Sequence, residues 1–172
     1  MKKKMLALLL SVSFVITACG SKNEEQLPDE FTAAMNDFCT QVSIVDDEIN
    51  SIDPESDGAV KDLLSYLDEL NENFEGFSNL DFPEEFDYLE SLADESADYM
   101  KQAVDMYHEA YGNDGYNEYT VAYAKEYYSR AYKRLQIIIS FLHGETPDDA
   151  DVVITNSDGT QKTGEEINDQ TE

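Results

Sequence analysis

The chain has 172 residues and a formal charge of −27, because 38 acidic side chains face 11 basic ones. Such an excess of acid excludes nucleic acid as an expected partner, since binding to phosphates needs lysine and arginine. The length suits one domain with flanking segments. Much of the charge is expected to form a solvated surface, which keeps the protein soluble and favours cationic partners.

The N-terminus has the layout of a secretory signal peptide, which we assign to residues 1–18. Three lysines precede the largely apolar residues 5–16, a run shorter than the roughly 20 residues that span a bilayer. The residues that follow, Ile16-Thr17-Ala18-Cys19, resemble the lipobox of bacterial lipoproteins. The resemblance implies a diacylglyceryl group on Cys19, cleavage before it and attachment to the outer face of the cell membrane. The alternative is an ordinary signal peptide with a chance cysteine.

Cleavage before Cys19 would leave 154 residues and remove three lysines, taking the formal charge from −27 to −30. Two acyl chains give stable anchoring where one is marginal. We expect residues 19–27 to be a short tether between the lipid and the domain. Once Cys19 is acylated, Cys39 has no partner within the chain and is expected to pack as a small apolar side chain. An intermolecular disulfide or a reactive thiol is the alternative for Cys39.

Residues 28–144 contain four runs of apolar residues with the alternating spacings of three and four that mark one face of a helix. The runs predict helices from Pro28 to Ile52, from about 57 to 77, from 83 to 111 and from about 116 to 143. Short connections between them indicate antiparallel neighbours, so the predicted fold is an all-α, up-and-down four-helix bundle. The predicted core residues are Phe31, Met35, Phe38, Val42, Val45, Ile49, Ile52, Val60, Leu63, Leu67, Leu70, Phe74, Phe77, Phe86, Leu89, Ala93, Ser96, Met100, Ala103, Tyr107, Ala110, Val121, Ala124, Tyr128, Ala131, Leu135, Ile138 and Leu142.

Residues 145–172 form an acidic tail rich in aspartate, threonine, asparagine and glycine. The favoured interpretation is a mostly disordered segment, because it has too little apolar surface to form a core. The alternative pairs Val152–Thr155 with Thr160–Thr163 as a small hairpin, which is marginal in water on its own.

No motif in the sequence indicates an enzyme. Phosphate-binding loops, dinucleotide fingerprints and nucleophile elbows are absent, and we predict no catalytic residue, metal or cofactor. His108 and His143 fall at opposite ends of the predicted bundle, too far apart to hold one ion. Paired carboxylates occur by chance throughout so acidic a chain, and they carry no indication of catalysis.

Tyrosine is the least ordinary feature of the composition, since ten of the eleven lie between Tyr88 and Tyr132 among small residues. One interpretation is core packing of large side chains against small ones. The other is a groove, because tyrosine combines an apolar ring with a polar tip and is enriched at recognition surfaces. A groove rimmed by acids would suit a cationic or amphipathic ligand. The candidate binding residues are Tyr107, Tyr111, Tyr119, Tyr123 and Tyr127.

These patterns predict an extracytoplasmic lipoprotein held at the membrane through Cys19, with a ligand- or protein-binding role in the cell envelope. The alternative is a structural or accessory lipoprotein that partners a membrane protein complex. The domain resembles the small helical-bundle lipoproteins of bacteria. That resemblance concerns architecture, and it assigns no functional residue.

Overall fold

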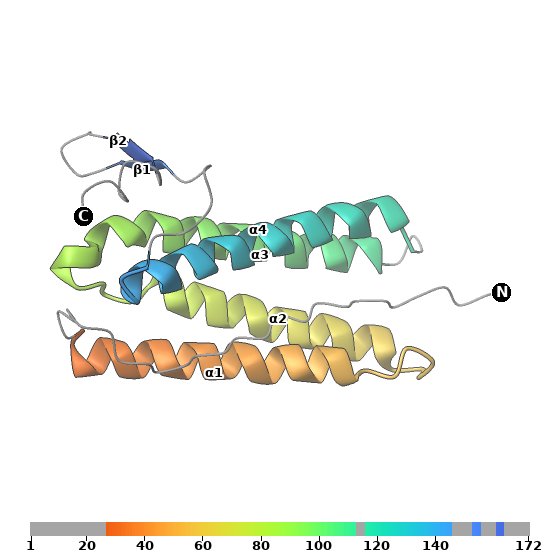
Figure 1. Cartoon of the computed structure of the whole chain (residues 1–172). Helices are drawn as coiled ribbons and strands as arrows, with labels where there is room; N and C mark the ends of the chain where they lie inside the picture. The colour runs from red at the N-terminus through yellow and green to blue at the C-terminus, as the bar shows by residue number, and fades with distance from the viewer. Residues whose placement is uncertain (1–26, 113–115, 146–152, 156–160, 164–172) are drawn as a thin grey trace.

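The computed structural model is a bundle of four helices lying side by side (Figure 1). It describes residues 27–112, 116–145, 153–155 and 161–163. The signal peptide, the lipobox and most of the tail therefore lie outside the described residues. The helices are α1 (Asp29–Ser51), α2 (Ala59–Ser78), α3 (Glu90–Ala110) and α4 (Glu118–Leu142), with a 3-10 helix, η1 (Glu84–Leu89), before α3. The predicted all-α fold is confirmed.

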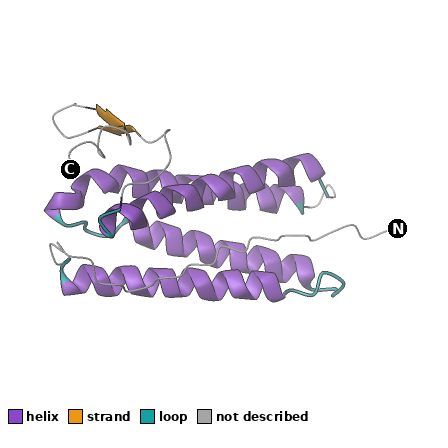
Figure 2. Cartoon of the chain, in the orientation of Figure 1, coloured by secondary structure: helices purple, strands orange, loops and turns teal. Residues whose placement is uncertain are grey.

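Successive helices are neighbours: α1 packs on α2, α2 on α3 and α3 on α4. The chain runs up and down, so α1 begins at the same end of the bundle where α2 ends and where η1 begins (Figure 2). The opposite end holds the connection at 52–58, the end of α3 and the start of α4, and we call it the distal end. Within the described residues, no helix is long and apolar enough to cross a membrane.

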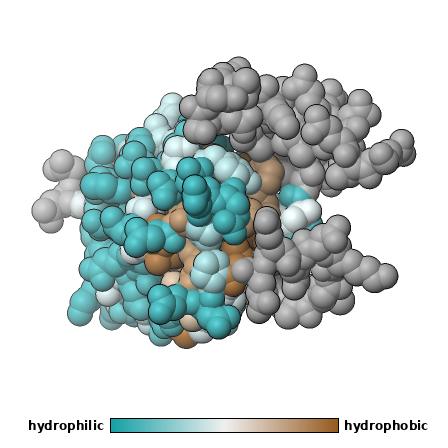
Figure 3. Space-filling view, turned by 90° about the vertical axis from the view of Figure 1, so that its left-hand side faces the viewer, coloured by the Kyte–Doolittle hydropathy of each residue, from teal (hydrophilic) through white to brown (hydrophobic). Residues whose placement is uncertain are grey.

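The apolar stripes expected from the sequence form the core of the bundle. Figure 3 looks from the end where α1 begins and shows apolar side chains enclosed by hydrophilic outer faces. Val60 was wrongly assigned to the core: in the first turn of α2 the buried position is Ala59, four residues before Leu63, and Val60 is 40% exposed. Ile52 and Leu142 lie at helix ends and Phe86 lies within η1, and all three are half-buried.

The third predicted helix starts differently from the expectation. Residues that were expected to open an α-helix at Pro83 form η1 instead, and the α-helix begins at Glu90. The N–H of Phe86 donates to the Pro83 carbonyl over 2.7 Å, a bond between residues three apart that winds this segment more tightly. Phe82, just before this turn, is buried against Phe31, with ring centres 5.2 Å apart.

Small side chains line the contact between α3 and α4. The hydroxyl of Ser96 is buried there and donates to the Ala131 carbonyl over 2.8 Å, so a side chain of one helix bonds the backbone of the other. Small residues allow two helix backbones to approach closely, and the large rings nearby fill the remaining space. The fully buried small residues of these two helices are Ala93, Ser96, Ala103 and Ala110 on α3 and Ala124 and Ala131 on α4.

A two-stranded ladder lies in the tail. Strands β1 (Val153–Thr155) and β2 (Gln161–Thr163) pair antiparallel, with Val153 opposite Thr163. This agrees with the hairpin alternative for these residues. The favoured prediction of a mostly disordered tail concerns residues that lie largely outside those described.

Candidate functional site

Three tyrosines near the start of α4 extend into solvent. Tyr116 is 52% exposed, Tyr119 is 83% exposed and Tyr123 is 59% exposed. The helix start that positions them is fixed by Asn117, whose side-chain oxygen accepts hydrogen bonds from the backbone N–H groups of Tyr119 and Thr120. We call Tyr116, Tyr119 and Tyr123 the exposed tyrosine surface.

The structure does not bring the five predicted binding tyrosines onto one surface. Tyr119 and Tyr123 are exposed, whereas Tyr111 and Tyr127 are half-buried. Tyr107 is fully buried, because it lies on the face of α3 that packs into the core. The two interpretations of the tyrosines therefore apply to different members of the set. Sequence reasoning placed Tyr116 in the cluster but did not select it as a binding residue.

Farther along α4, two arginines lie over tyrosine rings. The guanidinium carbon of Arg130 is 5.5 Å from the ring centre of Tyr127 and 5.8 Å from that of Tyr99. Arg134 lies 5.3 Å from the ring centre of Tyr99 and donates to Glu95 over 3.0 Å. These distances are within the roughly 6 Å range of cation–π attraction. We call Tyr99, Tyr127, Arg130 and Arg134 the arginine–tyrosine stack.

Tyr119, Tyr123 and the members of the stack that belong to α4 lie on one face of that helix. Tyr119, Tyr123 and Tyr127 follow one another at intervals of four residues, and Arg130 continues the same face three residues later. The face thus carries a tyrosine with an arginine over it, Tyr127, near its centre and two exposed tyrosines, Tyr119 and Tyr123, toward its start.

A buried carboxylate joins α1 to α4. Asp46 is 8% exposed and accepts hydrogen bonds from the hydroxyls of Tyr128, at 2.9 Å, and Tyr132, at 2.8 Å. Burial raises the pKa of Asp46, while the hydrogen bonds from Tyr132 and Tyr128 oppose that rise and the nearby charge of Asp47 adds to it. We call Asp46, Tyr128 and Tyr132 the Asp46 cluster.

Sequence reasoning missed Asp46. The available signal was its position four residues after Val42 and three before Ile49, which places it on the buried face of α1. That signal was obscured because 38 acidic residues are spread along the chain.

The hydroxyl of Tyr107 is buried without a hydrogen-bond partner among the described residues. Burial raises the pKa of Tyr107 well above its ordinary value, and the neighbouring Tyr111 and Tyr116 add to the shift. Burial likewise raises the pKa of Tyr128 and of Tyr132, so all three phenols stay protonated at neutral pH. They can donate hydrogen bonds, but they do not supply a phenolate for catalysis.

The remaining reactive side chains lie apart from one another. Cys39 is half-buried against the core, and burial raises the pKa of its thiol, which fits packing better than reactivity. His108 contacts Asp68 of α2 at 2.6 Å on the surface, while exposed His143 follows the end of α4. In the described ranges, no group of three or more histidine, cysteine, aspartate or glutamate residues is placed to hold a metal ion.

Comparison of the chain with models of protein families, with curated proteins and with solved structures found no match. A functional assignment for this protein therefore rests on its own residues and their geometry.

Proposed function

We propose that this protein is a lipid-anchored lipoprotein of the bacterial cell envelope that binds a ligand or a protein through its exposed tyrosine surface. The observation that carries the proposal is the exposure of Tyr116, Tyr119 and Tyr123, between 52% and 83%, near the start of one helix. Among the described residues, the other exposed large apolar side chains are Ile44 and Val60, which lie on different helices, α1 and α2. Isolated exposed residues are ordinary on a folded protein, whereas grouped aromatic ones mark interaction sites.

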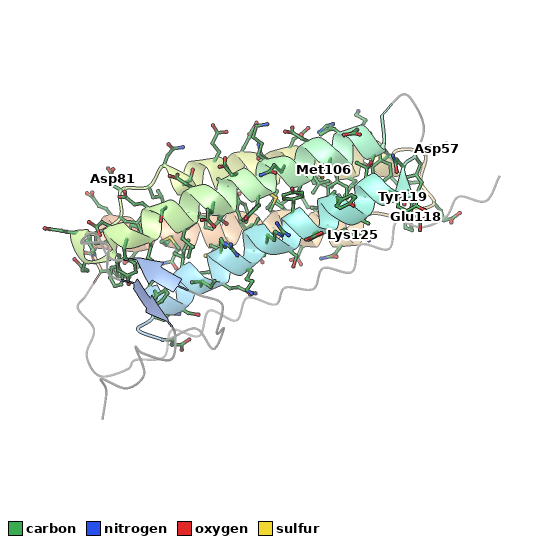
Figure 4. All side chains as sticks on the ribbon, turned by 90° about the horizontal axis from the view of Figure 1, so that it is seen from above. Asp57, Asp81, Met106, Glu118, Tyr119 and Lys125 are labelled. Atoms are coloured by element: carbon green, nitrogen blue, oxygen red, sulfur yellow. The ribbon has the colours of Figure 1, made fainter. Side chains whose placement is uncertain are left out.

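The anchor and the fold together orient this surface. Residues 19–27 reach at most about 30 Å when extended, and they lead to the start of α1. The 23 residues of α1 then span roughly 35 Å to the distal end of the bundle. Tyr119 lies at that distal end, close to Asp57 in the view of Figure 4. With Cys19 in the membrane, the exposed tyrosines would be presented toward the space beyond it.

Site-specific crosslinking in intact cells tests the binding role. A photoreactive residue in place of Tyr119 is expected to capture an envelope component, whereas the same residue in place of exposed Ile44 on α1 serves as the matched control. Capture from position 119 alone supports the proposal. Capture of a membrane protein from position 44 alone would support the accessory role and contradict the binding surface.

The anchor is tested separately, through Cys19. We expect the Cys19→Ala variant to incorporate no labelled fatty acid and not to remain membrane-bound through its domain, since so acidic a domain has no attraction for anionic lipid. Tight membrane binding of this variant after a salt wash would instead indicate a protein partner in the membrane and would favour the accessory role.

A further inference from the structure

We infer that the exposed tyrosine surface receives the cationic side chains of a basic peptide segment from another protein. The inference rests on the proposed function and names the chemistry of its partner. It follows from three observations, namely the way the chain's own arginines use tyrosine, the charges at the distal end and the spacing of the rings.

The arginine–tyrosine stack shows how this face of α4 binds a cation. Arg130 lies over Tyr127, and carboxylates hold both arginines of the stack: Glu126 pairs with Arg130 and Glu95 with Arg134. Within this molecule, a tyrosine ring together with a nearby carboxylate thus binds an arginine side chain. Tyr123 precedes Tyr127 by one helical turn and is 59% exposed. A cation from a partner would extend the same pattern toward the start of the helix.

The charges at the distal end favour a cation there. The backbone N–H groups of Tyr119 and Thr120, at the start of α4, are not open to an anion, because they already donate to the Asn117 side chain. The basic residues that oppose the acidic charge of this end are Lys61, in the first turn of α2, and Lys125, which lies farther along α4 in Figure 4. The exposed acids of this end and of the helix turns that adjoin it are Asp53, Glu55, Asp57, Asp62, Glu109 and Glu118.

The spacing of the rings favours a peptide over a small amine. Tyr119 and Tyr123 are separated by four residues, which is a rise of about 6 Å along the helix. A small quaternary ammonium ion is recognised by rings that enclose it, whereas Tyr119 is 83% exposed and Tyr123 is 59% exposed. An open row of rings instead suits successive cations on an extended chain. Headgroups of the anchoring membrane would lie near the opposite end of the bundle.

Titration of the lipidated chain in nonionic micelles tests the inference. The probe is a peptide of alternating arginine and glycine, with a glutamate–glycine peptide of equal length as its control. We expect the Tyr119→Ala/Tyr123→Ala double variant to bind the arginine peptide about 5- to 30-fold more weakly than the native chain. The Tyr119→Phe/Tyr123→Phe variant should retain most of the affinity, because it keeps both rings. The matched control is Ile44→Ala/Val60→Ala, which removes exposed apolar side chains from other helices and should bind normally.

Two outcomes would overturn the inference. Equal binding by the native chain and the double alanine variant would show that the peptide responds to general acidity. Capture of a partner from position 119 in cells, combined with no affinity for the arginine peptide, would show a surface of different ligand chemistry. In that second case the proposed function would stand while its cationic partner would be rejected. Circular dichroism of each variant checks that the helices remain folded.

Discussion

Two pairs of tyrosines on α4 have opposite environments. Tyr119 and Tyr123 extend into solvent, whereas Tyr128 and Tyr132 are buried and bonded to Asp46. Each exposed tyrosine precedes a buried one by nine residues, which is two and a half turns of an α-helix. The two pairs therefore lie on opposite faces of α4. Tyrosines that cluster in the sequence thus have different roles, because the turn of the helix places them on different faces.

The largest expected contrast is between truncations on the two faces. Tyr128→Ala should lower the free energy of unfolding by about 3–5 kcal/mol, since it empties a large volume in the core. Tyr119→Ala should change the same quantity by no more than about 0.5 kcal/mol, because its side chain is exposed. Urea denaturation of both variants measures the contrast. A large loss of stability in Tyr119→Ala would mean that this residue supports the fold and does not belong to a free surface.

A second contrast separates buried hydroxyls that have partners from one that has none. Tyr132→Phe should cost about 1–3 kcal/mol of stability, because Asp46 loses a hydrogen-bond donor and stays buried. Tyr107→Phe should be neutral or stabilising, since its buried hydroxyl has no partner among the described residues. The two substitutions remove the same atom, so each controls for the other. Equal losses in denaturation experiments would show that the hydroxyl of Tyr107 is also bonded.

The pH dependence of stability sharpens the description of the Asp46 cluster. Because burial raises the pKa of Asp46, the folded chain holds that proton more tightly than the unfolded chain. The stabilisation from protonation is complete below the ordinary aspartate value of about 3.9 and is lost as pH rises through the raised pKa. Asp46→Asn removes this dependence and leaves Tyr128, Tyr132 and Asp47 in place. The free energy of unfolding of this variant, relative to that of the native chain, should be greatest near pH 7 and should decrease on acidification.

The native chain and the Asp46→Asn variant share all their other acids, so the difference in stability between the two proteins at each pH reports on Asp46 alone. A difference that stays constant from pH 7 to pH 4 would show that the carboxyl keeps its ordinary pKa. A difference that grows on acidification would reverse the sign and would show that the folded chain favours the charged form.

The smallest expected effect concerns the net charge of the whole molecule. A formal charge of −27 opposes compactness, and salt screens that repulsion. We expect the melting temperature to rise by about 2–4 °C between low salt and 0.2 M NaCl, equivalent to about 1 kcal/mol. Calorimetry across a salt series measures the rise. A flat or falling curve would show that surface charges are already paired.

Helical periodicity was sufficient to predict the four helices and most of the core. It failed at Val60, because Ala59 takes the buried position in the first turn of α2, and at Pro83–Leu89, where tighter winding replaces the α-helix. The exposure of Tyr119 and the burial of Tyr107 follow from which face of each helix meets a neighbour. The position of Asp46 on the buried face of α1 was a usable signal, but its bonds to Tyr128 and Tyr132 could not be predicted before α4 was placed opposite it. Periodicity within one helix does not contain these contacts between helices.

The close contact of α3 and α4 has a consequence for local unfolding. Their small facing side chains bring the two backbones together, whereas α1 contacts the rest chiefly through α2 and through the Asp46 cluster. Local openings that release α1 therefore disrupt less packing than openings that separate α3 from α4. In amide hydrogen exchange, protection should be longest in the central turns of α3 and α4 and shorter along α1. If Cys19 is lipidated, the less protected helix α1 is also the one that follows the tether to the membrane.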